Sequence, residues 1–244
     1  MPERHVPADG ERPGGVATGR STPVSARRRR FRLIVFDWDG TLVDSTQLIA
    51  SSIRAACRDL GLPVPSRASA RHVIGLGLED ALRLVAPALP LARYGELALR
   101  YRHHFVLRDA EIPLFPGVRR MLQELEDGGA LLAIATGKSR RGLDRALEQQ
   151  AIGRHFVASR CADEGFAKPH PGMLEHLLER AGAGRDETLM IGDTTHDLEM
   201  ARNAGVGAVA VSYGAHPREA LERHAPLAIV DSPQALREWL AVYS

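Results

Sequence analysis

The stretch Leu33-Ile34-Val35-Phe36-Asp37-Trp38-Asp39-Gly40-Thr41 decides the fold. Its first four residues are branched or aromatic and a glycine turn follows them, which predicts a buried β-strand. Asp37 and Asp39 therefore follow the end of a core strand, which is where open α/β sheets bind ligands. Two acids so close together are hard to keep ionised without a cation. The stretch predicts a site that holds a metal ion, a shared proton, or both.

The rest of the chain alternates apolar strands with amphipathic helices. We expect further strands at 131–135, 156–159, 188–191, 208–211 and 227–230, and helices at 117–127, 140–150, 171–181 and 196–204. This alternation predicts an α/β fold, with a Rossmann-like parallel sheet as its core and helices on both faces.

One region breaks the alternation and reads as helices only. We expect these at about 46–60, 67–73, 79–87 and 91–109, with a flexible turn at Gly75-Leu76-Gly77. The predicted organisation is a core domain at 31–45 and 115–244 and an α-helical cap at 46–114. We expect the cap to cover the carboxyl edge of the sheet, with the glycine turn dipping toward it.

The first 30 residues form a basic, Pro- and Gly-rich tail that we expect to be disordered, because it lacks large apolar residues. The tail carries a charge of +4 and the remaining chain −2, so the folded part shows no basic footprint for nucleic acid.

Composition also bounds the setting in which the protein works. No apolar stretch approaches 18 residues, so no membrane contact is expected, and the amino terminus lacks the apolar segment of a signal peptide. Two cysteines in 244 residues are too few for a disulfide framework. The cytoplasm is the expected location, and the oligomeric state is left open.

Polar residues follow four of the predicted strands, and together they resemble the motifs of the haloacid dehalogenase superfamily of hydrolases. The resemblance runs in order from residue 31 to the end of the chain, and its insertion is similar to the small helical cap of the phosphoglycolate phosphatase-like branch. The four matching segments are Asp37-Trp38-Asp39-Gly40-Thr41, Ala135-Thr136-Gly137-Lys138, Lys168-Pro169 and Gly192-Asp193-Thr194-Thr195-His196-Asp197.

The resemblance assigns the two early aspartates separate tasks. It implies that Asp37 is the nucleophile and forms an aspartyl phosphate, while Asp39 is the general acid and later the base. Asp37, Asp193 and the main-chain carbonyl of Asp39 would be ligands of Mg²⁺, a cation that prefers oxygen. Asp197, about one helical turn after Asp193, would be an outer ligand or an orienter of water.

The remaining motif residues would bind the transferring phosphoryl group. Thr136 and the amide of Gly137 could donate to its oxygens at a helix amino terminus. Lys168 would supply a positive charge, and it is one of only two lysines beside 30 arginines. Lys138, the other lysine, could line the substrate entrance or be a solvated residue at a helix start.

Within the superfamily, the residues favour hydrolysis. Dehalogenases lack the second aspartate, sugar phosphomutases carry a histidine where Ile49 stands, and phosphonatases need a cap lysine that residues 46–114 lack. The expected activity is Mg²⁺-dependent hydrolysis of a small phosphorylated metabolite, with phosphoglycolate as a candidate. The alternatives are a nucleotidase, an inorganic pyrophosphatase, or a non-catalytic interaction protein.

Four further residues carry expectations of their own. Arg71 and Arg83 flank the glycine turn, and either could bind an acidic substrate or lie on a solvated helix face. His196 stands between the acids of the last motif, where we expect a surface residue. Trp38 should point away from the metal and pack in the core.

Overall fold

A computed structural model describes residues 31–243 of the chain, so the predicted tail lies outside the described residues. Its centre is a six-stranded sheet in the order β3-β2-β1-β4-β5-β6, and every neighbouring pair is parallel. The predicted α/β fold class is therefore confirmed. The strands are β1 (Leu33–Phe36), β2 (Leu131–Thr136), β3 (Phe156–Cys161), β4 (Thr188–Gly192), β5 (Gly207–Val211) and β6 (Ala228–Val230).

Strand register brings the polar motifs to one edge of the sheet. β1 lies between β2 and β4, and Phe36 is level with Ile134 and Ile191. Because all three strands run in the same direction, the residues that follow them lie side by side. β3 extends two residues beyond its predicted end, since Cys161 pairs with Thr136 at the end of β2.

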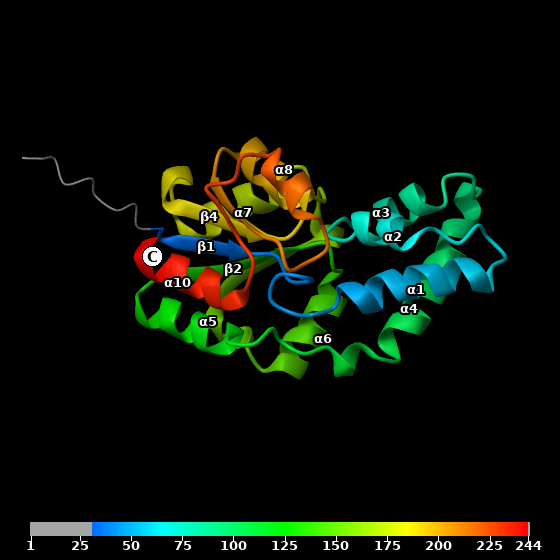
Figure 1. The fold of residues 1–244 in the computed structure, drawn as a ribbon, viewed down its shortest axis with the longest axis horizontal. Coiled ribbons are helices and arrows are strands. Elements are labelled where there is room, and N and C mark those ends of the chain that lie inside the picture. The colour runs from blue at the N-terminus through cyan, green and yellow to red at the C-terminus, as the bar shows by residue number, and fades with distance from the viewer. Residues whose placement is uncertain (1–30, 244) are drawn as a thin grey trace, which may run out of the picture.

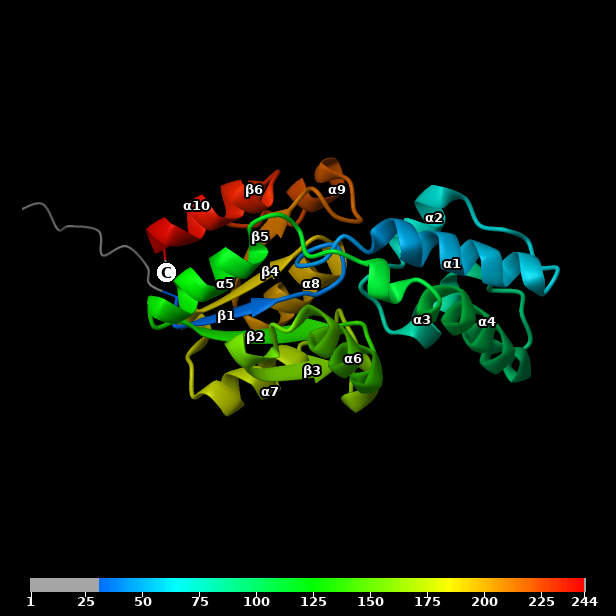
Figure 2. The ribbon, with the colours of Figure 1, turned by 90° about the horizontal axis from the view of Figure 1, so that it is seen from below.

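Helices cover both faces of the sheet, as Figure 2 shows. Ile34 and Phe36 point toward the face packed by α5 (Val118–Asp127) and α10 (Pro233–Tyr243). Leu33 and Val35 point toward the opposite face, which is packed by α7 (Gly172–Ala181) and α8 (Thr195–Ala204). Successive side chains of a strand alternate between faces, so β1 is apolar throughout and buried on both sides.

The other core elements are short or lie at the rim. α6 (Arg140–Gln150) follows β2, and α9 (Arg218–Glu222) follows β5. Neither α9 nor α10 was predicted from the sequence, although α10 buries Leu236 and Leu240 one helical turn apart. Single 3₁₀ turns occur at Gly153–His155, Ala162–Glu164 and Arg185–Glu187.

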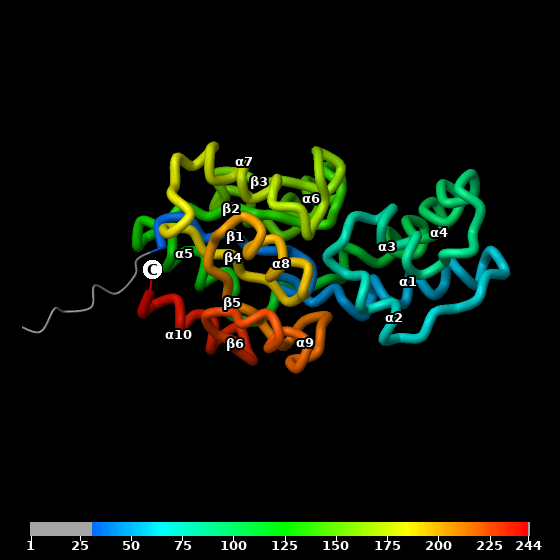
Figure 3. Tube along the Cα trace, turned by 90° about the horizontal axis from the view of Figure 1, so that it is seen from above, coloured from blue at the N-terminus to red at the C-terminus, as the bar shows by residue number. Residues whose placement is uncertain are grey.

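Four helices form a separate body beyond the carboxyl ends of the strands, and we call it the cap (Figures 1 and 3). They are α1 (Thr46–Asp59), α2 (Arg67–His72), α3 (Leu78–Val85) and α4 (Tyr94–Val106). The predicted helix at 91–109 is divided, because 3₁₀ turns at Leu91–Arg93 and Asp109–Glu111 flank α4. The cap has an apolar core of its own, which includes Ala56, Cys57, Leu82 and Leu97.

Within residues 31–243, the longest helix has 14 residues, and none is both long and apolar enough to cross a bilayer.

Candidate active site

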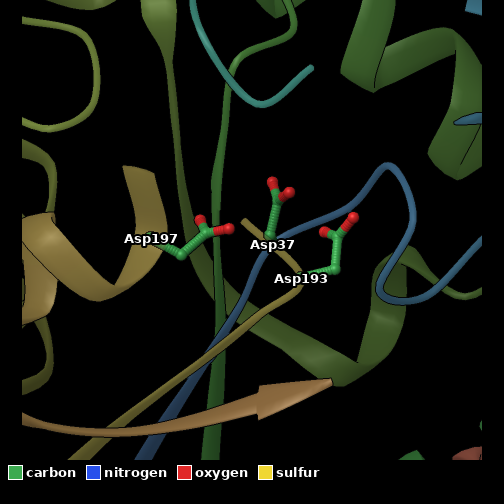
Figure 4. Close-up of side chains that lie close together, drawn as sticks. All are labelled: Asp37, Asp193 and Asp197. Carbon is green, nitrogen blue, oxygen red and sulfur yellow. The ribbon is translucent and has the colours of Figure 1, made fainter. Parts of the chain in front are cut away.

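Three buried carboxylates converge at the sheet edge that faces the cap. Asp37 follows β1, Asp193 follows β4, and Asp197 lies in the first turn of α8. Figure 4 shows their side chains turned toward a shared space, and one oxygen from each lies within 4.8 Å of the others. Each residue is at most 1% exposed. The sequence had placed all three at this edge, and the structure brings them together.

Lys168 supplies the positive charge among these acids. Its Nζ lies 2.7 Å from Asp37 Oδ1 and 2.6 Å from Asp197 Oδ1, and its side chain is fully buried. Burial raises the pKa of Asp37 well above its usual value, although Lys168 opposes the shift. Burial, together with repulsion from Asp197, raises the pKa of Asp193 to about 7. The single ammonium of Lys168 therefore cannot balance the charge of three ionised carboxylates.

The site has the features that a divalent cation needs. Asp37 Oδ2 is buried and has no hydrogen-bond partner in the part of the chain that the structure describes. A buried carboxylate oxygen without a donor is costly, and a cation would satisfy it. An all-oxygen donor set suits Mg²⁺ better than softer metals. Asp37 and Asp193 could hold such an ion.

Asp197 is committed to other partners. Its Oδ1 accepts from Lys168, and its Oδ2 accepts from the amide of Thr194 at 3.1 Å and the hydroxyl of Thr194 at 2.7 Å. Thr194 is also the N-cap of α8, so the same contacts start the helix. Asp197 therefore contacts Lys168 Nζ through Oδ1 and the N-cap of α8 through Oδ2.

Main-chain and hydroxyl donors fix the carboxylate of Asp193. Thr41 Oγ1 donates to Oδ1 at 2.9 Å, and the Ala215 amide donates to Oδ2 at 2.6 Å. Gly40 and Gly214 lie so close that a Cβ at either would collide with this carboxylate. Close approach of the backbone therefore requires glycine at both positions.

Asp39 is not part of the three-carboxylate cluster. Its Oδ1 accepts from the Ser45 hydroxyl at 2.7 Å and lies 3.2 Å from Lys138 Nζ. Lys138 is 12% exposed at its side chain and lies over the ring of Phe105, a cap residue on α4, at 4.7 Å. The alternative prediction that Lys138 is a solvated residue at a helix start is therefore wrong.

The cap closes over the end of β2. Thr136 is fully buried, and its Oγ1 accepts from the Lys138 amide at 3.2 Å. A Cβ on Gly137 would collide with the main-chain oxygens of Gly75 and Leu76, which belong to the predicted glycine turn of the cap. This turn therefore touches the residues expected to bind phosphate.

A family comparison agrees with this geometry. The family described as haloacid dehalogenase-like hydrolase matches residues 34–211. The chain belongs to this family. The predicted resemblance is confirmed, and the catalytic chemistry of the protein is that of a hydrolase.

Individual relatives refine the comparison. The hydrolase is 38% identical to a protein named probable phosphatase IndB of Dickeya dadantii, over 82% of this chain and 89% of that one. It is 30% identical to a phosphoglycolate phosphatase of Vibrio parahaemolyticus, over 86% and 96% of the two chains. It is also similar to the crystal structure of a predicted phosphoglycolate phosphatase from Haemophilus somnus, with a TM-score of 0.76, 25% identity, and coverage of 88% and 98%.

Another relative is named for a different activity. The hydrolase is 33% identical to a protein named tyrosine-protein kinase PtkA of Mycobacterium tuberculosis, over 75% of this chain. It spans only 62% of the length of that protein.

The structure corrects or settles three smaller expectations for the hydrolase. His196 is half-buried instead of exposed, because its Nε2 lies 3.0 Å from the His72 carbonyl of the cap. Arg83 lies on a solvated face and pairs with Glu79, one helical turn away. Trp38 is buried in the core, as expected.

Several residues around the site were not predicted from the sequence. Ser45 and Phe105 touch Asp39 and Lys138 only because of how the cap entry and α4 fold, and no local pattern marks them. The loop that contains Ala215 could have been found, because it follows the carboxyl end of β5. In a parallel sheet every such loop is a candidate for the site.

Proposed function

We propose that this hydrolase cleaves phosphate monoesters of small metabolites and uses Mg²⁺. The observation that carries the proposal is Asp37, a buried carboxylate that has Lys168 beside one oxygen and, within residues 31–243, no donor on the other. In the proposed division, residues 31–45 and 115–244 form the catalytic core and residues 46–114 form the cap. The cytoplasm is part of the proposal, because Cys57 and Cys161 are both unpaired.

The first step transfers the phosphoryl group to the protein. An oxygen of Asp37 forms a bond to phosphorus as the bond from phosphorus to the ester oxygen breaks, which gives an aspartyl phosphate. Asp39 donates its proton to the departing alcohol. Thr136, Gly137 and Lys168 bind the phosphoryl oxygens and stabilise the charge that they carry.

The second step regenerates the nucleophile. Asp39, now ionised, accepts a proton from water as that water attacks phosphorus, and the bond from phosphorus to Asp37 breaks. Lys138 and Ser45 both contact Oδ1 of Asp39 and hold its carboxyl group in place.

Asp37 and Asp193, with the main-chain carbonyl of Asp39, would hold the metal ion. When bound, Mg²⁺ offsets the repulsion between the Asp37 carboxylate and the anionic substrate. Asp197 is proposed as the residue that orients Lys168, since it accepts a hydrogen bond from Nζ at 2.6 Å.

The cap favours a small substrate. The turn at Gly75 and Leu76 lies against Gly137, which limits the space over the proposed phosphate-binding residues at the end of β2. A lid of this kind excludes water and selects substrates by size. Phosphoglycolate is a candidate because a relative bears that activity in its name.

A phosphometabolite screen tests the proposal. We expect purified protein to release phosphate from small monoesters with Mg²⁺ and to lose turnover with EDTA. Asp37→Asn should abolish turnover while circular dichroism shows an unchanged fold. Nucleotides and pyrophosphate in the same screen separate the two alternative hydrolases, and a tyrosine-containing protein with ATP tests the activity named for PtkA. Turnover that survives in Asp37→Asn would show that Asp37 is not the nucleophile and would contradict the mechanism.

A further inference from the structure

The loop between β5 and α9 joins the cap to the proposed metal site. On the core side, its main chain holds Asp193. The Ala215 amide donates to Asp193 Oδ2 at 2.6 Å, and the His216 amide donates to the Asp193 carbonyl at 3.3 Å. Gly214 lies directly against the same carboxylate. A shift of this loop would therefore shift a proposed ligand atom.

On the cap side, the same loop is bound by one arginine. Arg71, in α2, donates from Nη2 to the Gly214 carbonyl at 2.5 Å and from Nε to the Ala215 carbonyl at 3.3 Å. Nη1 lies 3.4 Å from Thr46 Oγ1. In the described part of the chain, neither carbonyl has another donor. The planar guanidinium thus spans two successive residues of the loop, which an ammonium could not do.

A second contact lies beside the first. His216 Nδ1 accepts from the Thr195 amide at 3.1 Å, so its proton is on Nε2, which donates to the His72 carbonyl at 2.9 Å. His72 is the next residue after Arg71, at the end of α2. Two neighbouring cap residues therefore bind the loop by which Asp193 is held.

We propose that Arg71 is a positioning residue for the metal site. It holds the main chain at 214–215, so that the Ala215 amide keeps Asp193 Oδ2 in its place. The affinity for the metal ion then depends on whether the cap is closed against the core, with Arg71 bound to the loop at 214–215. The inference rests on the proposed function only in taking Asp193 as a metal ligand, and it concerns binding of the ion instead of turnover.

The test measures metal binding without substrate. Mn²⁺ serves as the probe: free Mn²⁺ is followed by electron paramagnetic resonance, and Mg²⁺ is added as a competitor. Loss of a partner that orients a ligand typically weakens metal binding by about 10- to 100-fold, and Arg71 acts one contact further out. We expect Arg71→Ala to weaken binding of both ions by about 5- to 10-fold.

Two further variants make the result interpretable. Arg83→Ala removes an exposed cap arginine that pairs with Glu79 and lies over the ring of Tyr94, both cap residues, and it should bind Mn²⁺ like the wild type. Gly214→Ala leaves Arg71 intact but pushes directly on Asp193, and it should weaken Mn²⁺ binding as well. Near-ultraviolet circular dichroism confirms that each variant is folded.

The outcomes separate the two proposals. If Arg71→Ala and Gly214→Ala bind Mn²⁺ as the wild type does, while only KM rises, the positioning role is wrong. Arg71 then contacts substrate or holds the cap against the core. If metal binding depends on Arg71 but no monoester is turned over, the positioning role stands and the proposed function fails.

Discussion

Asp39 is surrounded by groups that distinguish its task from that of Asp37. Its side chain lies outside the carboxylate cluster and contacts Ser45 and Lys138 instead. The sequence placed both aspartates at one strand end, and the resemblance divided their roles. Only the folded chain shows that the two side chains face different partners.

Loss of the proton donor should depend on the leaving group. We expect Asp39→Asn to lower kcat/KM on alkyl phosphates, which reports formation of the aspartyl phosphate, by about 10²- to 10⁴-fold, the usual range for general acid catalysis. The loss should be much smaller on p-nitrophenyl phosphate, because a nitrophenolate leaves without a proton. Steady-state kinetics on both substrates give the comparison. An equal loss on both would show that Asp39 is not the general acid.

Lys138 should affect catalysis through its contact with Asp39. We expect Lys138→Met, which keeps the packing on Phe105 but removes the charge, to lower kcat/KM by about tenfold, the effect of roughly 1.4 kcal/mol. Lys138→Arg retains the charge and serves as the control. If both variants match the wild type, the ion pair with Asp39 has no catalytic role.

At the scale of elements, strand ends were predictable and contacts between cap and core were not. The apolar run before Asp37 and the glycine turn after it predicted β1, and alternation predicted its parallel neighbours. Polar residues such as Arg160 hid the last part of β3, which exists because it pairs with Ala135 of β2. The exposure of His196 could not be predicted, since it depends on how α2 docks onto α8.

The contact of α2 with α8 should be sensitive to acid. His216 is 2% exposed, its titratable neighbours are His72, His196 and Asp197, and burial lowers the pKa of His216 to about 4. Between pH 6.5 and 4 the unfolded chain binds a proton that the folded chain does not, so stability falls as pH falls.

We expect this residue to contribute about 2 kcal/mol to the loss of stability between pH 7 and 4.5. Urea unfolding in EDTA at the two pH values measures the loss. His216→Gln can still donate to the His72 carbonyl but cannot titrate, so its loss should be smaller by that amount. An identical pH dependence in wild type and variant would contradict the assignment.

At the scale of the whole molecule, the cap lies tightly against the catalytic edge at Gly137. Gly137 has main-chain oxygens of Gly75 and Leu76 directly above it, and a Cβ there has no space. We expect Gly137→Ala to keep the core folded but to push the cap open. Backbone atoms cannot move aside as a flexible side chain can, so the rigid-body shift of the cap is the easier relaxation.

Small-angle X-ray scattering and kinetics together measure this effect. Gly137→Ala should have a larger radius of gyration than the wild type, and kcat/KM should fall at least tenfold, because an open cap leaves water over Asp37. Gly95→Ala, in α4, is the matched control, since within residues 31–243 no heavy atom outside its own helix backbone and chain neighbours lies within 4 Å of its Cβ position. It should stabilise the cap by up to about 1 kcal/mol and leave the scattering unchanged. A kinetic loss in Gly137→Ala without a change in radius would assign the effect to phosphate binding at the Gly137 amide, and not to closure of the cap.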